Sequence, residues 1–129
     1  AMMPMMQFSV APWRILSKEN LDICIKYAKW HEQLGSYLIA QAKQSAKTGE
    51  PIVRSMEYAF PNQRFADCKD QYMLGDKYLV APVVTESDTR TVKLPKGTWR
   101  DDQGKKYKGG KTYTLQVPLD RLPYFIINE

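Results

Sequence analysis

Apolar positions divide the chain into three stretches that differ in periodicity. Residues 1–16 form an apolar segment that prolines interrupt. Between residues 17 and 48, apolar side chains recur at spacings of three and four, as at Leu21, Cys24 and Ala28, which is typical of a helix. From residue 50 onward, short apolar runs and alternating segments are separated by turns, which is typical of strands. The pattern therefore predicts a loop, a long helix and a β domain, in that order.

The long helix is predicted over about residues 17–48. Ser17 is a suitable N-cap, and Gly49 supplies a conventional stop. Gly35 weakens the middle by about 1 kcal/mol relative to alanine, which favours a bend or a break there. The apolar face of this helix is broad enough to pack against a large body. Without such a body, the face must pack on the β domain, self-associate or stay partly exposed, so we expect the chain to oligomerise.

The β domain is predicted from short segments with apolar or alternating character. Residues 57–70 are expected to be a loop, and Pro82 is expected to end or bulge the apolar run before it. Turns with glycine at residues 101–104 and 108–111 favour hairpins. The predicted strands are Ile52–Met56, Lys77–Val84, Arg90–Pro95, Gly97–Asp101, Thr112–Pro118 and Pro123–Asn128. Strands at this spacing predict an antiparallel sandwich or barrel.

Length and composition restrict the class of protein. The 129 residues, of which 43% are hydrophobic and 26% charged, suit one globular domain or two small pieces. No apolar run approaches the roughly 20 residues that span a bilayer, so no membrane segment is predicted. The opening segment lacks the basic start and the unbroken apolar core of a signal peptide. We interpret it instead as an internal loop of a larger protein.

The net charge of +5 comes largely from lysines and arginines in the C-terminal half. A nucleic-acid surface would show this pattern, and so would the solvated strand edges of a β domain. No RNP-like motif, helix-turn-helix or zinc finger accompanies the basic residues. The sequence therefore favours solvated edges, and we expect no nucleic-acid partner.

Cysteine and histidine usage argues against a metal site. Cys24 and Cys68 form no CxxC motif, and His31 is the one histidine of the chain. We expect two free thiols, a structural His31, no metal and no cofactor. Free thiols fit a reducing compartment, but the sequence leaves open whether the protein is cytoplasmic or periplasmic.

No group of residues forms a recognisable catalytic constellation by itself. The chain has no Ser/His/Asp set and no phosphate-binding loop. Two carboxylate pairs, Asp101 with Asp102 and Glu86 with Asp88, lie in polar turns, where carboxylates are usually hydrated. Asp76 follows a glycine at a corner and is expected to cap that turn. None of these acids is predicted to be catalytic.

Aromatic residues of the β domain permit a different hypothesis. In this hypothesis Trp99, Tyr107 and Tyr113 serve as platforms that stack on sugar rings, although a core role suits Trp99 equally well. The chain would then be a stand-alone β-sandwich module that binds carbohydrate or another partner. Against this hypothesis stands the apolar helix face, which has no purpose in a free sandwich.

Four motifs in order resemble the C-terminal part of glycoside hydrolase family 31, the α-glucosidase and α-xylosidase family. They are GEPIVR (49–54), DQYMLG (70–75), LVAPV (79–83) and LPKGTW (94–99), and the closing PLDRLPYFI is similar to the usual ending of the family. The segment MMQFSVAPWRIL also resembles a family segment, with Gln7, Pro12 and Arg14 as the best matches. The resemblance therefore covers nearly the whole chain.

The resemblance implies an α+β architecture. Residues 1–56 would be the end of a (β/α)8 barrel with its long helix, and residues 57–129 the antiparallel β-sandwich that follows. The run Leu79–Val84 would lie in the sandwich core, because strands covered on both faces are continuously apolar. The parent would be a retaining α-glycosidase that hydrolyses terminal α-linked sugars and binds oligosaccharides or α-glycosides.

The resemblance also implies what this chain lacks. Family members use two aspartates, in a D-x-N-E-type and a G-D-N-type motif, and neither motif occurs here. The chain alone is thus expected to be inactive. Its remaining link to the substrate cleft would be the loop 5–16, with Gln7, Trp13 and Arg14, since such loops line barrel clefts. Leu16 stands where many relatives have a histidine, which leaves glucose, xylose and galactose open as the substrate sugar.

Overall fold

A computed structural model of the chain describes residues 1–128. The chain divides into two compact units, Ala1–Ile52 and a β domain that starts at Val53. The domain boundary that the resemblance implies after residue 56 stays a prediction. Within the described residues, every helix is too short or too polar to traverse a lipid bilayer.

The first unit is helical over most of residues 17–48, as the periodicity predicts, and the predicted loop 1–16 also contains a short helix, which is a correction to that prediction. It contains α1 (Pro12–Ile15), α2 (Lys18–Gln33) and α3 (Gly35–Thr48). The Asn20 N–H donates to Ser17 Oγ at 3.3 Å, which confirms the N-cap. The predicted break occurs at Leu34, directly before Gly35, and Gly49 ends α3 in the left-handed conformation with φ 77°.

His31 has a structural contact within this unit. Its Nδ1 lies 2.7 Å from the carbonyl oxygen of Ala1. Because a carbonyl oxygen only accepts, the imidazole nitrogen donates this hydrogen bond. The contact ties the start of the chain to α2, which agrees with the predicted structural role.

Apolar side chains on both long helices reach solvent. Ile25 on α2 is 43% exposed, and Ile39 on α3 is 58% exposed. Self-association of the chain stays a prediction, and we expect light scattering to show a mass that rises with protein concentration. The double substitution Ile25→Lys/Ile39→Lys should reduce that rise, since it places charge on the apolar face. A constant monomer mass at high concentration would contradict the prediction.

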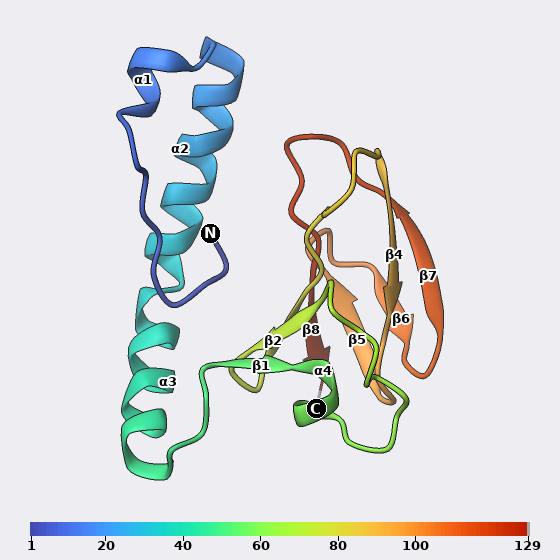
Figure 1. Ribbon diagram of the computed structural model, residues 1–129. Coiled ribbons are helices and arrows are strands. Elements are labelled where there is room, and N and C mark those ends of the chain that lie inside the picture. Colours follow the sequence, from blue (N-terminus) through green and yellow to red (C-terminus); the bar gives the residue numbers. More distant parts are fainter. Residues whose placement is uncertain (129) are drawn as a thin grey trace. The chain divides into compact units, whose positions relative to one another are not determined.

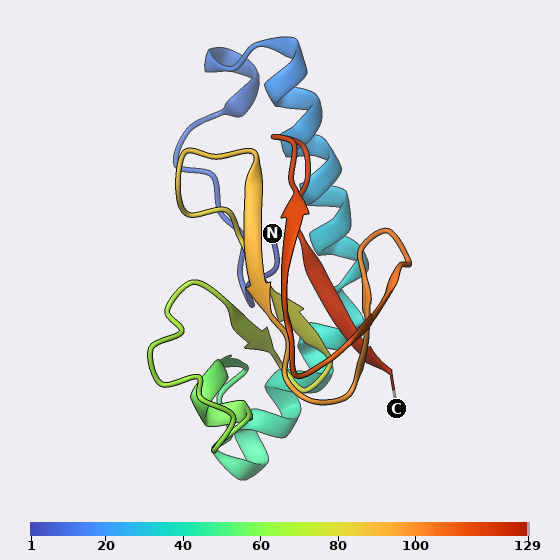
Figure 2. The same ribbon diagram turned by 90° about the vertical axis from the view of Figure 1, so that its right-hand side faces the viewer.

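The β domain contains two antiparallel sheets (Figures 1 and 2). Six strands follow the order β1-β2-β3-β8-β5-β6, and β4 pairs with β7 in a separate two-stranded sheet. The strands are β1 (Val53–Ser55), β2 (Tyr72–Leu74), β3 (Tyr78–Val80), β4 (Thr89–Lys93), β5 (Thr98–Asp101), β6 (Lys106–Lys108), β7 (Thr112–Gln116) and β8 (Tyr124–Asn128). The prediction of an antiparallel β domain is confirmed.

One hydrophobic core joins the two sheets. It includes Met73, Leu79, Trp99 and Phe125 from the six-stranded sheet, and Val92 and Leu115 from the β4–β7 pair. Apolar side chains from the inner faces of both sheets therefore pack against one another, as in a β-sandwich. The strand predicted over residues 90–95 alternates between the core and solvent, because Val92 and Leu94 are buried while Thr91 is exposed.

In the β domain, the structure adds three short elements that the pattern did not reveal. The predicted loop 57–70 begins with part of a helical turn, α4 (Met56–Ala59), which Ser55 caps by accepting the Tyr58 N–H at 3.2 Å. Strands β2 and β6 have three residues each. Segments this short show too few alternations to be recognised by themselves, whereas β1 and β3, which are equally short, lie within longer predicted strands.

The apolar run Leu79–Val84 was expected to lie in the core along its whole length, which is wrong at its end. Leu79, Val80 and Ala81 are fully buried, whereas Val84 is 60% exposed. Strand β3 ends before Pro82, because proline has no N–H to donate to a neighbouring strand. The predicted role of Pro82 is thus confirmed, and the residues after it form a surface loop.

The prediction of a hairpin at residues 108–111 is also wrong. β6 pairs with β5, and β7 pairs with β4, so this turn crosses from one sheet to the other. The Gly109 N–H donates to the Gly97 carbonyl at 2.7 Å, and the Gly110 N–H donates to the Leu94 carbonyl at 2.9 Å. Contacts with the segment 94–97, rather than a partner strand, therefore hold the turn.

Gly109→Ala is expected to destabilise the β domain, because a Cβ there would lie 1.9 Å from the Pro95 carbonyl oxygen. Backbone atoms must shift to admit it, and overpacking of this kind costs about 1–3 kcal/mol. Urea unfolding measures the loss. The matched control is Gly35→Ala, where nothing lies within 4 Å of the added atom. The control should leave stability unchanged or raise it, and equal losses in both variants would contradict the steric explanation.

Candidate functional site

The three residues predicted for the substrate cleft lie at the start of the helical unit. Gln7 is in the loop before α1, and Trp13 and Arg14 are neighbours within α1. Pro12 starts this short helix, and the Leu16 N–H ends it by donating to the Pro12 carbonyl at 3.0 Å. The structure therefore places Trp13 and Arg14 on one helical turn.

Residues 5–15 expose an unusual amount of apolar surface. Trp13 is 71% exposed, and four other apolar side chains of this segment are also exposed. These are Met5 (79%), Phe8 (44%), Val10 (55%) and Ile15 (66%). Single exposed apolar residues are common, but five in one short segment are typical of a surface that binds a ligand or packs against another part of a protein.

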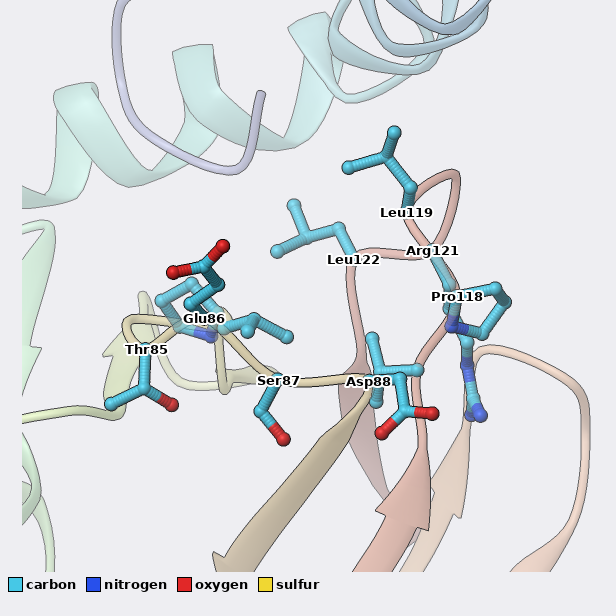
Figure 3. Close-up of a pocket in the computed structure, with 11 residues that line it drawn as sticks. Thr85, Glu86, Ser87, Asp88, Pro118, Leu119, Arg121 and Leu122 are labelled. Atoms are coloured by element: carbon cyan, nitrogen blue, oxygen red, sulfur yellow. The ribbon is translucent and has the colours of Figure 1, made fainter.

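The β domain has an apolar pocket of about 730 Å³ between two loops (Figure 3). One loop follows β3 and supplies Pro82 and Val83, and the other connects β7 to β8 and supplies Pro118, Leu119 and Leu122. The side chains of Pro82, Val83, Leu119 and Leu122 give the pocket its apolar character.

Carboxylates at the rim of this pocket do not form a catalytic pair. Glu86 and Asp88 line it, but their side chains point in different directions (Figure 3). Both are exposed, as expected for acids in a polar turn. A general acid works in a desolvated pocket, and neither of these exposed carboxylates lies in one.

The prediction that the other carboxylate pair is hydrated is wrong. Asp101 is only 3% exposed, because Arg121 and Tyr107 enclose it. Arg121 forms a two-pronged ion pair with Asp102 at 2.9 and 2.8 Å and reaches Asp101 at 3.4 Å. Its third contact is the Gln116 carbonyl at 2.8 Å. Nothing in the sequence indicated this role for Arg121, because its two acidic partners lie about twenty positions away.

Arg121, Asp101 and Asp102 join the β5–β6 turn to the loop after β7, and each carboxylate is held by a partner. Asp101 Oδ1 accepts the N–H groups of Gln103 and Lys105 at 3.0 and 2.8 Å, which fixes the β5–β6 turn. The hydrogen bond to Asp102, and the charges around it, raise the pKa of the Arg121 guanidinium. Each group has a partner, so the network is a structural clamp next to the apolar pocket.

Tyr107 makes the clamp sensitive to alkaline pH. Burial, and secondarily the Asp101 carboxylate to which its hydroxyl donates at 3.1 Å, raise the Tyr107 pKa above its usual 10.0. The neutral form thus stabilises the folded state below about pH 10, and this contribution is lost as pH rises through the higher folded-state pKa. Urea unfolding between about pH 7 and 11 should show a steeper alkaline loss than in Tyr107→Phe. Tyr58→Phe, at an exposed position, should keep the wild-type slope, and parallel curves for all three proteins would contradict the assignment.

The D-Q pair of the DQYMLG motif has a structural task. The Asp70 carboxylate lies 2.8 Å from buried Arg90, which also donates to the Asp70 and Pro82 carbonyls. Gln71 bonds the backbone of Lys93 twice, at 2.7 and 3.1 Å. Asp70 also raises the pKa of the neighbouring Cys68 thiol, although burial is the larger cause. The motif therefore fastens β4 to the segment before β2.

The proposed sugar-stacking platforms are wrong for two of the three aromatic residues. Trp99 is fully buried, and its Nε1–H donates to the Pro95 carbonyl at 2.9 Å. Tyr107 is 8% exposed, and its ring stacks edge-on against Tyr113 with centroids 4.9 Å apart. A buried ring offers no face to a sugar, so neither Trp99 nor Tyr107 can serve as a stacking platform.

The remaining sequence candidates stay apart. Asp76 is exposed in the turn between β2 and β3, and Cys24 and Cys68 are free thiols, as predicted. Within residues 1–128, no three His, Cys, Asp or Glu side chains gather closely enough to hold a metal ion. The predicted cleft segment is thus the strongest candidate site of the chain.

Comparison with known proteins connects the fold to one family of enzymes. Residues 49–128 match the family model "Glycosyl hydrolase family 31 C-terminal domain". The "Myogenesis-regulating glycosidase" of Mus musculus is 35% identical over 97% of this chain and 18% of its own length. An "Alpha-xylosidase" of Emericella nidulans is 33% identical over 89% of this chain and 16% of its own length.

Solved structures give the same result. The cycloalternan-degrading enzyme from Trueperella pyogenes superposes with a TM-score of 0.86 at 32% identity, covering 92% of this chain and 18% of that chain. A Flavobacterium johnsoniae dextranase, in complex with isomaltotriose, has the same TM-score at 33% identity, covering 92% of this chain and 15% of that chain. The chain thus spans less than a fifth of the length of each relative.

Proposed function

Because the chain belongs to glycoside hydrolase family 31, we propose that it is the C-terminal part of a retaining α-glycosidase that hydrolyses terminal α-linked sugars. The match to the C-terminal domain model of the family carries this proposal. Similar proteins named as an α-xylosidase, an α-glucosidase and a dextranase support an α-glycoside as the substrate class. The substitution at Leu16 leaves the sugar itself open among glucose, xylose and galactose.

We propose that residues 1–56 are the end of the catalytic (β/α)8 barrel and that the β domain follows it. The helical unit and the β domain together align with structures of family enzymes over 92% of the chain, which supports this division. In the parent, the apolar faces of α2 and α3 would pack against the rest of the barrel. Burial of Ile25 and Ile39 would then remove the apolar exposure seen in this chain.

Within the parent, Gln7, Trp13 and Arg14 would line the substrate cleft. The indole of Trp13, 71% exposed, has a free face suited to the apolar side of a sugar ring. The exposed side chains of Gln7 and Arg14 would supply hydrogen bonds to hydroxyl groups. These contacts position the substrate and take no part in breaking the bond.

Bond cleavage would depend on residues outside this chain. A retaining glycosidase needs one carboxylate to form the glycosyl-enzyme and a second to serve as acid and then as base, about 5–5.5 Å apart. The acids described above are exposed, or are held by Arg121 and Arg90. The β domain is therefore a scaffold, and the chain alone is expected to have no glycosidase activity.

Chromogenic α-glucoside, α-xyloside and α-galactoside assays test this proposal. The chain alone should give no turnover above the rate without protein, and turnover by it would overturn the claim that both carboxylates lie elsewhere. The genomic sequence directly upstream should encode a D-x-N-E motif. The protein that includes it should cleave one of the three glycosides with retention of the anomeric configuration, which NMR of the first product detects. Inversion, or absence of the motif, would overturn the assignment of the parent.

A further inference from the structure

A second pocket of the β domain, of about 420 Å³, shares no residue with the apolar pocket of Figure 3. It lies between the loop after α4 and the segment that follows β4. The side chains that define its chemistry are Asn62, Gln63, Arg64, Lys93 and Lys96. None of these residues belongs to the clamp or to the predicted cleft segment.

All the charged side chains that line this pocket are positive. Three cationic residues and two amides line it, and no aspartate or glutamate does. Within residues 1–128, neither Arg64 nor Lys96 forms an ion pair. Three cations without a neighbouring acid repel one another, and a bound anion would offset that repulsion by attracting each of them.

The backbone around the pocket is held in place. Asn62 and Arg64 both have left-handed conformations, with φ of 64° and 63°. The Lys96 N–H donates to Gln63 Oε1 at 2.8 Å, and the Lys93 ammonium donates to the Arg64 carbonyl. Because Gln63 Oε1 already accepts, its Nε2 is left as a donor for a ligand. The loop is therefore preorganised before anything binds.

One carboxylate does contact this loop, but outside the pocket. Glu57 accepts the Phe65 N–H at 3.0 Å and is not among the lining residues. The Phe65 ring is fully buried, and the Lys93 ammonium lies 4.5 Å from its centroid. A sugar ring would thus find no exposed aromatic face here, so a neutral saccharide suits the pocket poorly.

We propose that this pocket binds an oxyanion, either a phosphate or a carboxylate group. Arg64 would contribute the planar fork of its guanidinium, and Lys96 and Lys93 would contribute positive charge. Gln63 Nε2 and the amide of Asn62 would complete the set of donors. The assignment is independent of the proposed glycosidase activity, because it rests on the residues of the β domain alone.

NMR titration of the ¹⁵N-labelled chain tests the proposal. The probes are inorganic phosphate, glucose 6-phosphate, glucuronate and glucose, with sodium chloride holding the ionic strength constant. The three anions should cause saturable shifts at the amides of residues 62–65 and 96, and glucose should cause none. Tighter binding of the ester than of phosphate would show that a sugar contributes, and equal binding would show that the oxyanion suffices. No saturable shift, or equal shifts with glucose, would overturn the proposal.

Two double variants separate this pocket from the general positive charge of the chain. Arg64→Ala/Lys96→Ala should weaken phosphate binding by about tenfold or more. Lys106→Ala/Lys108→Ala removes the same charge from exposed positions on β6 and should retain affinity within about twofold. Circular dichroism verifies that both variants are folded. An equal loss in the two variants would overturn the assignment of a defined site.

Discussion

Trp99→Ala is expected to lower the free energy of unfolding of the β domain by about 3–5 kcal/mol. Trp99 is fully buried between the two sheets, and its indole packs edge-on against Phe60 with centroids 6.0 Å apart. The substitution leaves a cavity and deprives the Pro95 carbonyl of the Nε1–H donor at 2.9 Å. Urea unfolding followed by far-UV circular dichroism measures the loss without relying on tryptophan fluorescence.

Trp13→Ala is the matched control for this substitution. It deletes the same side chain from a position that is 71% exposed, so the free energy of unfolding should change by less than about 0.5 kcal/mol. A loss below about 1 kcal/mol for Trp99→Ala would contradict its place in the core. In the proposed parent enzyme, Trp13→Ala would weaken substrate binding, whereas Trp99→Ala would again lower stability.

Arg121→Ala is expected to destabilise the β domain by about 3 kcal/mol, within the range for breaking a buried ion pair. The Arg121 side chain is 11% exposed, and its removal leaves Asp101 and Asp102 without their cation. Asp101 keeps its donors from Tyr107 and the turn, which places the loss at the lower end of that range. Urea unfolding at neutral pH and low salt measures the effect.

Arg100→Ala provides the control, because Arg100 is a neighbouring exposed arginine on β5. Its substitution should cost less than about 0.5 kcal/mol. The double variant Arg121→Met/Asp102→Leu should recover part of the loss, since removing both partners leaves less unpaired charge. Equal effects of Arg121→Ala and Arg100→Ala would show that the clamp contributes nothing beyond surface charge.

Much of the fold follows from periodicity and from capping residues. Ser17, Gly35 and Gly49 mark the start, the break and the end of the helical region, because each acts on the backbone within a few positions. The pattern likewise predicted a strand over residues 90–95, where β4 lies. The errors occur where a distant segment decides the outcome, as at Gly109, whose turn packs on Gly97 and not on a partner strand.

The sequence by itself determined the helical region, the antiparallel β domain and the family to which the chain belongs. These depend on local conformational preference and on the order of short motifs, which distant contacts do not alter. Only the tertiary structure decided that Asp101 is buried by Arg121, that Trp99 lies in the core and that Arg64 and Lys96 share a pocket with Lys93. Burial and ion pairing depend on contacts between segments that are distant in the sequence, and a local pattern does not predict which segments come into contact.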